Sequence, residues 1–143
     1  MYATLDDMLA RYGEDVVYTL ADTDGNGALD ESGAERSLRD ATGLINSYLG
    51  SRYPLPLPNT PALLTRLCVD IALYWLADDA GGATEERRQR FEDAIKWLES
   101  SAKGQVALGV EDDSEDGDDL VEEDGMAFSS AERLFSRRGL GRF

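Results

Sequence analysis

The fold is decided by the stretch Thr60-Pro61-Ala62-Leu63-Leu64-Thr65-Arg66-Leu67-Cys68-Val69-Asp70-Ile71-Ala72-Leu73-Tyr74-Trp75-Leu76-Ala77-Asp78-Asp79. Its apolar residues recur at helical spacing and form a wide apolar face, which comprises Leu64, Leu67, Cys68, Ile71, Tyr74 and Trp75. Thr60 is placed to cap a helix whose first residue is Pro61, where proline is well tolerated. We therefore predict a long helix at the centre of the molecule, with the lone cysteine, Cys68, in the core.

A further long helix is predicted on each side of this stretch. The earlier one follows the N-cap Asp30, ends at Gly50 and has a regular apolar face of Ala34, Leu38, Ala41, Ile45 and Tyr48. The later one follows the N-cap Thr84 and ends at Gly104, and its apolar positions are Phe91, Ala94, Ile95, Leu98 and Ala102. These segments predict three long helices that pack together.

Two short apolar segments precede the long helices. Thr4 and Asp7 have the spacing of a capping box, and the helical pattern that follows ends at Gly13. A second brief apolar segment lies between Glu14 and Leu20. The fold class predicted from the whole pattern is all-α: a small helical bundle of three long helices plus one or two short N-terminal helices, with an extended C-terminal arm.

All four prolines lie in the stretch Tyr53-Pro54-Leu55-Pro56-Leu57-Pro58-Asn59-Thr60-Pro61. Proline disfavours helix, so this stretch is predicted to be an extended strap between two helices. Its leucines and tyrosine make it too apolar for a free linker. We divide the chain into a helical bundle domain (residues 1–110), an acidic linker (111–125) and a basic, aromatic C-terminal docking arm (126–143).

The charge of the chain is strongly negative, with 29 acidic residues, 14 basic residues and no histidine. This excess makes the chain a poor binder of phosphates and disfavours direct recognition of nucleic acid. The longest apolar stretches are interrupted by Asp70, Asp78 and Asp79, and no apolar leader segment precedes them. We expect a soluble protein that is made in the cytoplasm, with no membrane partner.

The linker and the arm have opposite charge. Residues 111–124 hold ten carboxylates and no basic residue, a composition typical of a solvated run. Residues 126–143 hold four arginines, three phenylalanines and one acid. Arginine and aromatic residues are enriched among interface anchors, so the arm is predicted to bind a partner. The alternative is that the arm folds back on its own bundle or stays loose.

The loop Asp22-Thr23-Asp24-Gly25-Asn26-Gly27-Ala28-Leu29-Asp30 resembles the start of an EF-hand calcium loop. Its candidate ligands are Asp22, Asp24, Asn26, Ala28 through its carbonyl oxygen, and Asp30. The twelfth position, where a glutamate should complete the coordination, is Gly33. The alternative is a glycine-rich turn in which Asp30 caps the next helix. We expect no cofactor, with calcium as a lesser possibility.

Enzyme chemistry finds little support in the sequence. There is no histidine, no nucleophile elbow and no phosphate-binding glycine loop. The pair Asp78 and Asp79 is interpreted as a solvated helix end, because a catalytic acid needs a pocket that perturbs its pKa. We predict that the protein is not an enzyme.

Three segments together resemble one protein family: Met1 to Gly13, Leu44-Ile45-Asn46-Ser47-Tyr48-Leu49-Gly50-Ser51-Arg52-Tyr53-Pro54-Leu55-Pro56-Leu57, and Arg133-Leu134-Phe135-Ser136-Arg137. The chain is similar over nearly its whole length to the small proteins encoded among the head genes of Mu-like phages and prophages. The acidic insert before the arm is its least typical part. That family is in turn similar to the head-tail connector (adaptor) proteins of other long-tailed phages.

The resemblance implies a structural adaptor in the neck of a virion. Such connectors form a ring, usually of about twelve copies, under the portal protein and above a tail-side stopper or tail terminator protein, and DNA passes through the channel without specific binding. The arm would dock onto the portal through Arg133, Phe135, Arg137, Arg138, Leu140 and Phe143. A ring needs two different contact faces, whose candidates are Tyr53, Leu55, Leu57, Tyr74 and Trp97. For each of these candidates the alternative is core packing, most of all for Tyr74 and Trp97, because aromatic residues on helices usually face the core.

Two other functions compete with the adaptor. The first is an acidic mimic of DNA that inhibits a host protein, but it would need its charge spread over the folded bundle, whereas a third of the acids lie in residues 111–124. The second is a calcium-binding module built on the loop from Asp22 to Asp30. A calcium-dependent melting temperature would distinguish it.

Overall fold

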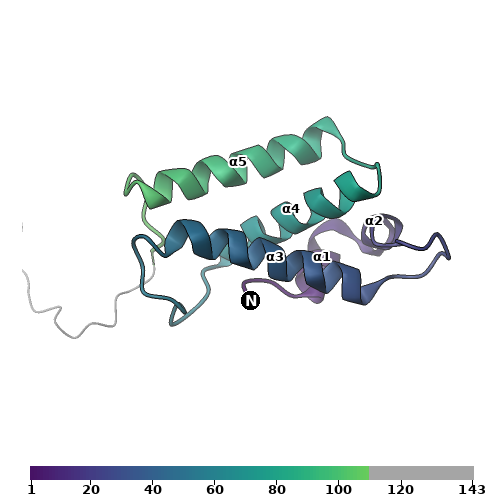
Figure 1. Cartoon of the computed structure of the whole chain (residues 1–143), viewed down its shortest axis with the longest axis horizontal. Helices are drawn as coiled ribbons and strands as arrows, with labels where there is room; N and C mark the ends of the chain where they lie inside the picture. The colour runs from purple at the N-terminus through teal and green to yellow at the C-terminus, as the bar shows by residue number, and fades with distance from the viewer. Residues whose placement is uncertain (110–143) are drawn as a thin grey trace, which may run out of the picture. The chain divides into compact units, whose positions relative to one another are not determined.

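A computed structural model describes residues 1–109, and these residues form five α-helices and no strand (Figure 1). The helices are α1 (Leu5–Tyr12), α2 (Glu14–Leu20), α3 (Glu31–Leu49), α4 (Ala62–Asp79) and α5 (Glu85–Ala102). The all-α class and the count of three long and two short helices are confirmed. The predicted linker and arm lie outside the described residues.

Helix α4 is the centre of the bundle, as its sequence predicts. It packs against α3 and α5 along their lengths and also contacts α1 and α2. The middle of α4 is buried on all sides, because the helix is apolar nearly all round; its buried apolar residues are Leu64, Leu67, Cys68, Val69, Ile71, Ala72, Leu73, Leu76 and Ala77. Cys68 is a buried free thiol, and burial raises its pKa.

The start of α4 differs from the prediction by one residue. Pro61, with φ −60° and ψ 145°, is extended and serves as the N-cap, so the helix begins at Ala62 and the side chain of Thr60 does not cap it. The Pro61 carbonyl accepts a hydrogen bond from the Leu64 N–H at 2.9 Å. The proline ring fixes φ but leaves ψ open, and the observed ψ places Pro61 before the helix.

The other predicted N-caps are confirmed, whereas α5 ends at Ala102, two residues before the predicted Gly104. The Asp30 carboxylate accepts from the Gly33 N–H at 3.0 Å and begins α3, and Thr84 accepts from the Arg87 N–H at 3.2 Å and begins α5. A Cβ on Gly33 would lie 2.8 Å from Asp30 Oδ2, so the absence of a side chain there lets the cap close. Thr4 and Asp7 form the complete capping box of α1.

The strap between α3 and α4 contains no helix, as its prolines predict, and its Leu55–Pro56 peptide bond is cis. Two contacts attach it to the end of α5 and to the segment that follows α5. The Tyr53 hydroxyl accepts from the Leu108 N–H at 3.2 Å, and Arg52 donates to the Ser101 carbonyl at 3.4 Å. Within residues 1–109, no helix is both long and apolar enough to cross a membrane.

Candidate functional site

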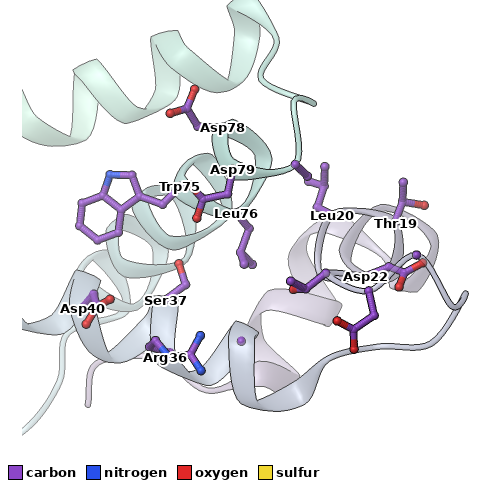
Figure 2. A pocket seen from close by; sticks show the side chains of 15 residues that line it. Thr19, Leu20, Asp22, Arg36, Ser37, Asp40, Trp75, Leu76, Asp78 and Asp79 are labelled. Atoms are coloured by element: carbon purple, nitrogen blue, oxygen red, sulfur yellow. The ribbon is translucent and has the colours of Figure 1, made fainter.

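A pocket of about 760 Å³ lies where the loop after α2 approaches the first half of α3 and the end of α4 (Figure 2). Its apolar lining comes from Leu20, Trp75 and Leu76. Five carboxylates also line it, and they are Asp22, Asp24, Asp40, Asp78 and Asp79. Figure 2 shows side chains of α3 and α4 on one side of the pocket and those at the end of α2 on the other.

Local hydrogen bonds hold the loop that forms one wall of this pocket. The Asp22 carboxylate accepts from the backbone N–H groups of Asn26 at 2.9 Å and Gly27 at 2.8 Å, which turns the chain back on itself. The Asp30 N–H donates to the Ala21 carbonyl at 3.2 Å and closes the base of the loop. The loop is therefore fixed at both of its ends, which keeps Asp22 and Asp24 beside the pocket.

The electrostatics of the pocket favour a cationic ligand. Arg36 is the one basic side chain among the lining residues, against five carboxylates. Within residues 1–109, none of these carboxylates takes part in an ion pair; the ion pairs found there involve Asp70 and the exposed face of α5. Negative charge in a concave site concentrates field lines and attracts cations.

The candidate calcium ligands are placed differently from an EF-hand. Asp22 and Asp24 line the pocket, but Asn26 accepts from the Ala28 N–H at 2.8 Å and Asp30 caps α3. Hydrogen bonds from Ser32 and from the Gly33 backbone lower the pKa of Asp30. Among residues 1–109, no group of three or more acidic, histidine or cysteine side chains is arranged to hold a metal. The alternative of a turn with a helix cap fits these contacts.

We predict that calcium leaves the thermal stability of the protein unchanged. Ligand binding to the folded state alone would raise the melting temperature, but Gly33 supplies no carboxylate at the twelfth position. The measurement is thermal unfolding in millimolar CaCl₂, with equimolar MgCl₂ as the control for charge screening and EDTA as the reference. A melting temperature that rises in calcium but not in magnesium would show that the loop binds calcium.

A second polar cluster, centred on Asp70, joins α1, α4 and α5. Asp70 is 6% exposed and accepts from Arg11 Nε at 2.8 Å, from Arg11 Nη2 at 3.2 Å and from the Tyr12 hydroxyl at 2.5 Å. Arg90 donates to the Tyr12 hydroxyl at 3.3 Å. The hydrogen bond to Asp70 raises the pKa of Arg11, and burial raises the pKa of Tyr12. The cluster fixes α1 against the centre of the bundle.

Neither the Asp70 cluster nor the pocket is predicted by the sequence pattern. In the sequence, Asp70 interrupts an apolar run, and the signal of the cluster is that an acid between buried residues needs a partner. Asp78 and Asp79 are exposed, as predicted for a helix end, but the loop after α2 also places Asp22 across the same pocket from them. That proximity has no local signal in the sequence.

The candidate subunit contacts occupy two regions of the bundle. In the strap, Leu55 is 37% exposed, whereas Tyr53 and Leu57 are half-buried and pack against the core. Tyr74 stacks on Phe91 with ring centroids 4.7 Å apart, and Trp97 is half-buried against the core. Their contacts with other copies stay a prediction. The docking residues Arg133, Phe135, Arg137, Arg138, Leu140 and Phe143 lie outside the described residues.

The fold and the site define a small, acidic, all-α protein built on a three-helix core with short N-terminal helices. The chain belongs to the family described as Bacteriophage Mu, Gp36, whose family model matches residues 2–125. It is 39% identical over 138 residues to Mu-like prophage FluMu protein gp36 of Haemophilus influenzae, which covers 96% of this chain and 94% of that protein. The match confirms the resemblance to proteins of Mu-like phages and prophages.

A phage relative supports the same assignment. The chain is 34% identical over 146 residues to Gene product J of Escherichia phage Mu, covering 98% of this chain and 97% of that protein. Both relatives are thus matched over nearly their whole lengths. The chain is therefore a protein of the Mu-like phage type.

Proposed function

We propose that the protein is a structural head-tail adaptor of a tailed phage, located in the neck of the virion, without enzymatic activity and without a cofactor. The observation that carries the proposal is membership of a phage Mu protein family over residues 2–125. A small helical bundle that ends before a basic, aromatic arm suits a protein that must contact several partners.

The proposed assembly is a ring under the portal, usually of about twelve copies in connectors, with a tail-side stopper or tail terminator protein below. Cyclic symmetry requires two different faces on each copy. The strap offers one face through Leu55, with Tyr53 and Leu57 beside it, and the α4–α5 surface offers another through Tyr74 and Trp97. The ring interface would cover these partly exposed apolar groups.

The charge of the bundle is consistent with a channel that DNA crosses without specific binding. Residues 1–109 alone contain 18 acidic and 10 basic residues, so the helical bundle keeps a net negative charge without the linker. A negative wall repels the duplex and lets it slide. The arm carries the opposite charge, and its arginines can pair with carboxylates on the portal while its phenylalanines fill apolar clefts.

We predict that a chain ending at Gly125 stays folded but no longer attaches to the portal. The core described within residues 1–109 is retained in the shortened chain, and the proposed docking residues all follow Gly125. The measurement is co-expression with the portal protein from the same genome, followed by affinity capture and imaging of the complex. The full chain is expected to form a ring on the portal, and the shortened chain is expected to remain free with an unchanged helical circular dichroism signal.

A charge-matched pair of variants separates a role of the arm from a general effect of charge. Arg133→Ala with Arg137→Ala removes two positive charges from the arm, whereas Arg39→Ala with Lys103→Ala removes two from exposed sites on the bundle. Only the double variant in the arm, Arg133→Ala with Arg137→Ala, should fail to bind the portal. Assembled heads that incorporate the chain ending at Gly125 as well as the full chain would contradict the proposal.

A further inference from the structure

The acidic pocket and the basic arm are complementary parts of the same protein. The pocket combines five carboxylates with the apolar lining of Leu20, Trp75 and Leu76. Residues 133–143, Arg-Leu-Phe-Ser-Arg-Arg-Gly-Leu-Gly-Arg-Phe, combine four arginines with two phenylalanines and contain no acid. We propose that the pocket of one copy binds the segment 133–143 of a second copy. This goes beyond the proposed function, because it gives the arm a partner in the absence of the portal.

The chemical groups of the pocket and of the segment 133–143 are complementary. Arginine forms strong, often bidentate hydrogen bonds with carboxylates. Asp22, Asp24, Asp78 and Asp79 offer such acceptors, and Figure 2 shows Asp22 on one side of the pocket and Asp79 on the other. The indole of Trp75 lies in the lining, where an arginine or a phenylalanine of the segment can stack on it. The ligand is thus a basic, aromatic peptide and not a metal ion.

The size of the pocket suits a piece of peptide. A volume of about 760 Å³ falls in the range of roughly 300–1,000 Å³ that is typical of sites for ligands larger than a single side chain. Several side chains of the segment can therefore enter together. The pocket also remains open to solvent through exposed Asp78 and Asp79, so the rest of the arm can leave it.

The chain is long enough to connect separate copies. Twenty-three residues separate Gly109 from Arg133, and at about 3.3–3.6 Å per residue they can span up to roughly 80 Å. Because pocket and segment are different surfaces, the contact is heterologous and joins copies head to tail, which closes as a reciprocal dimer or as a ring. In an assembly with the portal, the portal would compete with the pocket for the same segment.

The test uses the full chain alone, without portal, and compares two charge-reversed variants. The pocket variant carries Asp78→Lys and Asp79→Lys, which the end of α4 tolerates because cations favour a helix C-terminus. The arm variant carries Arg133→Glu and Arg137→Glu. Sedimentation velocity over a concentration series is expected to show that the natural chain self-associates and that each variant alone does so about tenfold or more weakly.

Mixing the two variants is the decisive experiment. The unchanged basic arm of the pocket variant then meets the unchanged acidic pocket of the arm variant, so the mixture should associate again. The matched control is Asp93→Lys with Glu99→Lys, which reverses two exposed charges on α5 outside the pocket and should associate like the natural chain. A natural chain that stays monomeric, or a mixture that is not restored, overturns the proposal.

The fluorescence of Trp75 locates the contact. With Trp97→Phe in every chain, Trp75 is the only tryptophan, and its emission should change with protein concentration in step with association. A change that depends on the arm charges but not on concentration would place each arm in its own pocket and overturn exchange between copies. No portal is present in these experiments, so a monomeric natural chain would not contradict the proposed adaptor function. Conversely, a chain that does not capture the portal would not contradict the proposed contact between the pocket and the segment 133–143.

Discussion

The Asp70→Ala variant is expected to lose about 3 kcal/mol of unfolding free energy. Asp70 is 6% exposed and receives three hydrogen bonds from Arg11 and Tyr12, so its removal leaves a guanidinium and a hydroxyl without their acceptor. Removing one partner of a buried ion pair costs about 3–5 kcal/mol. We take the lower end because the Arg11 side chain is 29% exposed and can recover part of its hydration.

Urea denaturation followed by circular dichroism measures this loss. Asp93→Ala is the matched control, because Asp93 is an exposed acid on α5 and exposed substitutions usually change stability by less than about 0.5 kcal/mol. In a double-mutant cycle, adding Arg11→Ala to Asp70→Ala should cost little more than Asp70→Ala alone, since the two groups share one interaction. A loss below about 1 kcal/mol for Asp70→Ala would show that the cluster does not hold α1 in place.

The helices of this protein could be predicted from sequence because their signals are local. A cap such as Asp30 with Gly33, or Thr84 with Arg87, is formed within one turn, and its residues stand three positions apart in the chain. Thr60 failed as a cap for an equally local reason. Pro61 can stand at the first helical position or just before it, and the residue types at this junction are compatible with both.

The sites could not be predicted in the same way, because they join distant parts of the chain. Arg11 and Asp70 are 59 positions apart, and Tyr12 and Arg90 are 78 positions apart. The pocket likewise combines a loop after α2 with residues at the end of α4. Periodicity predicts which residues are buried, but not which charged residue meets which. Only the packing of α1 and α2 against α4 supplies that information.

The Ile71→Ala variant is expected to lose about 3–4 kcal/mol of unfolding free energy, and Ile71→Val about 1 kcal/mol. Ile71 is 0% exposed in the middle of α4, so each methyl group removed gives up burial and leaves a cavity. Because α4 is surrounded by α3, α5 and the N-terminal helices, the neighbours have little freedom to close that cavity. The measurement is urea denaturation of the graded series from isoleucine through valine to alanine.

Leu55→Ala is the control for this series, and it separates stability from assembly. Leu55 is 37% exposed in the strap, so shortening it should cost under about 1 kcal/mol, yet it removes a proposed subunit contact. Equal losses for Leu55→Ala and Ile71→Ala would contradict the assignment of α4 as the buried centre and of the strap as a surface element. If Leu55→Ala leaves folding intact but weakens ring formation on the portal, the apolar strap contributes to assembly. The substitution would then remove a contact between neighbouring copies without lowering the stability of a single copy.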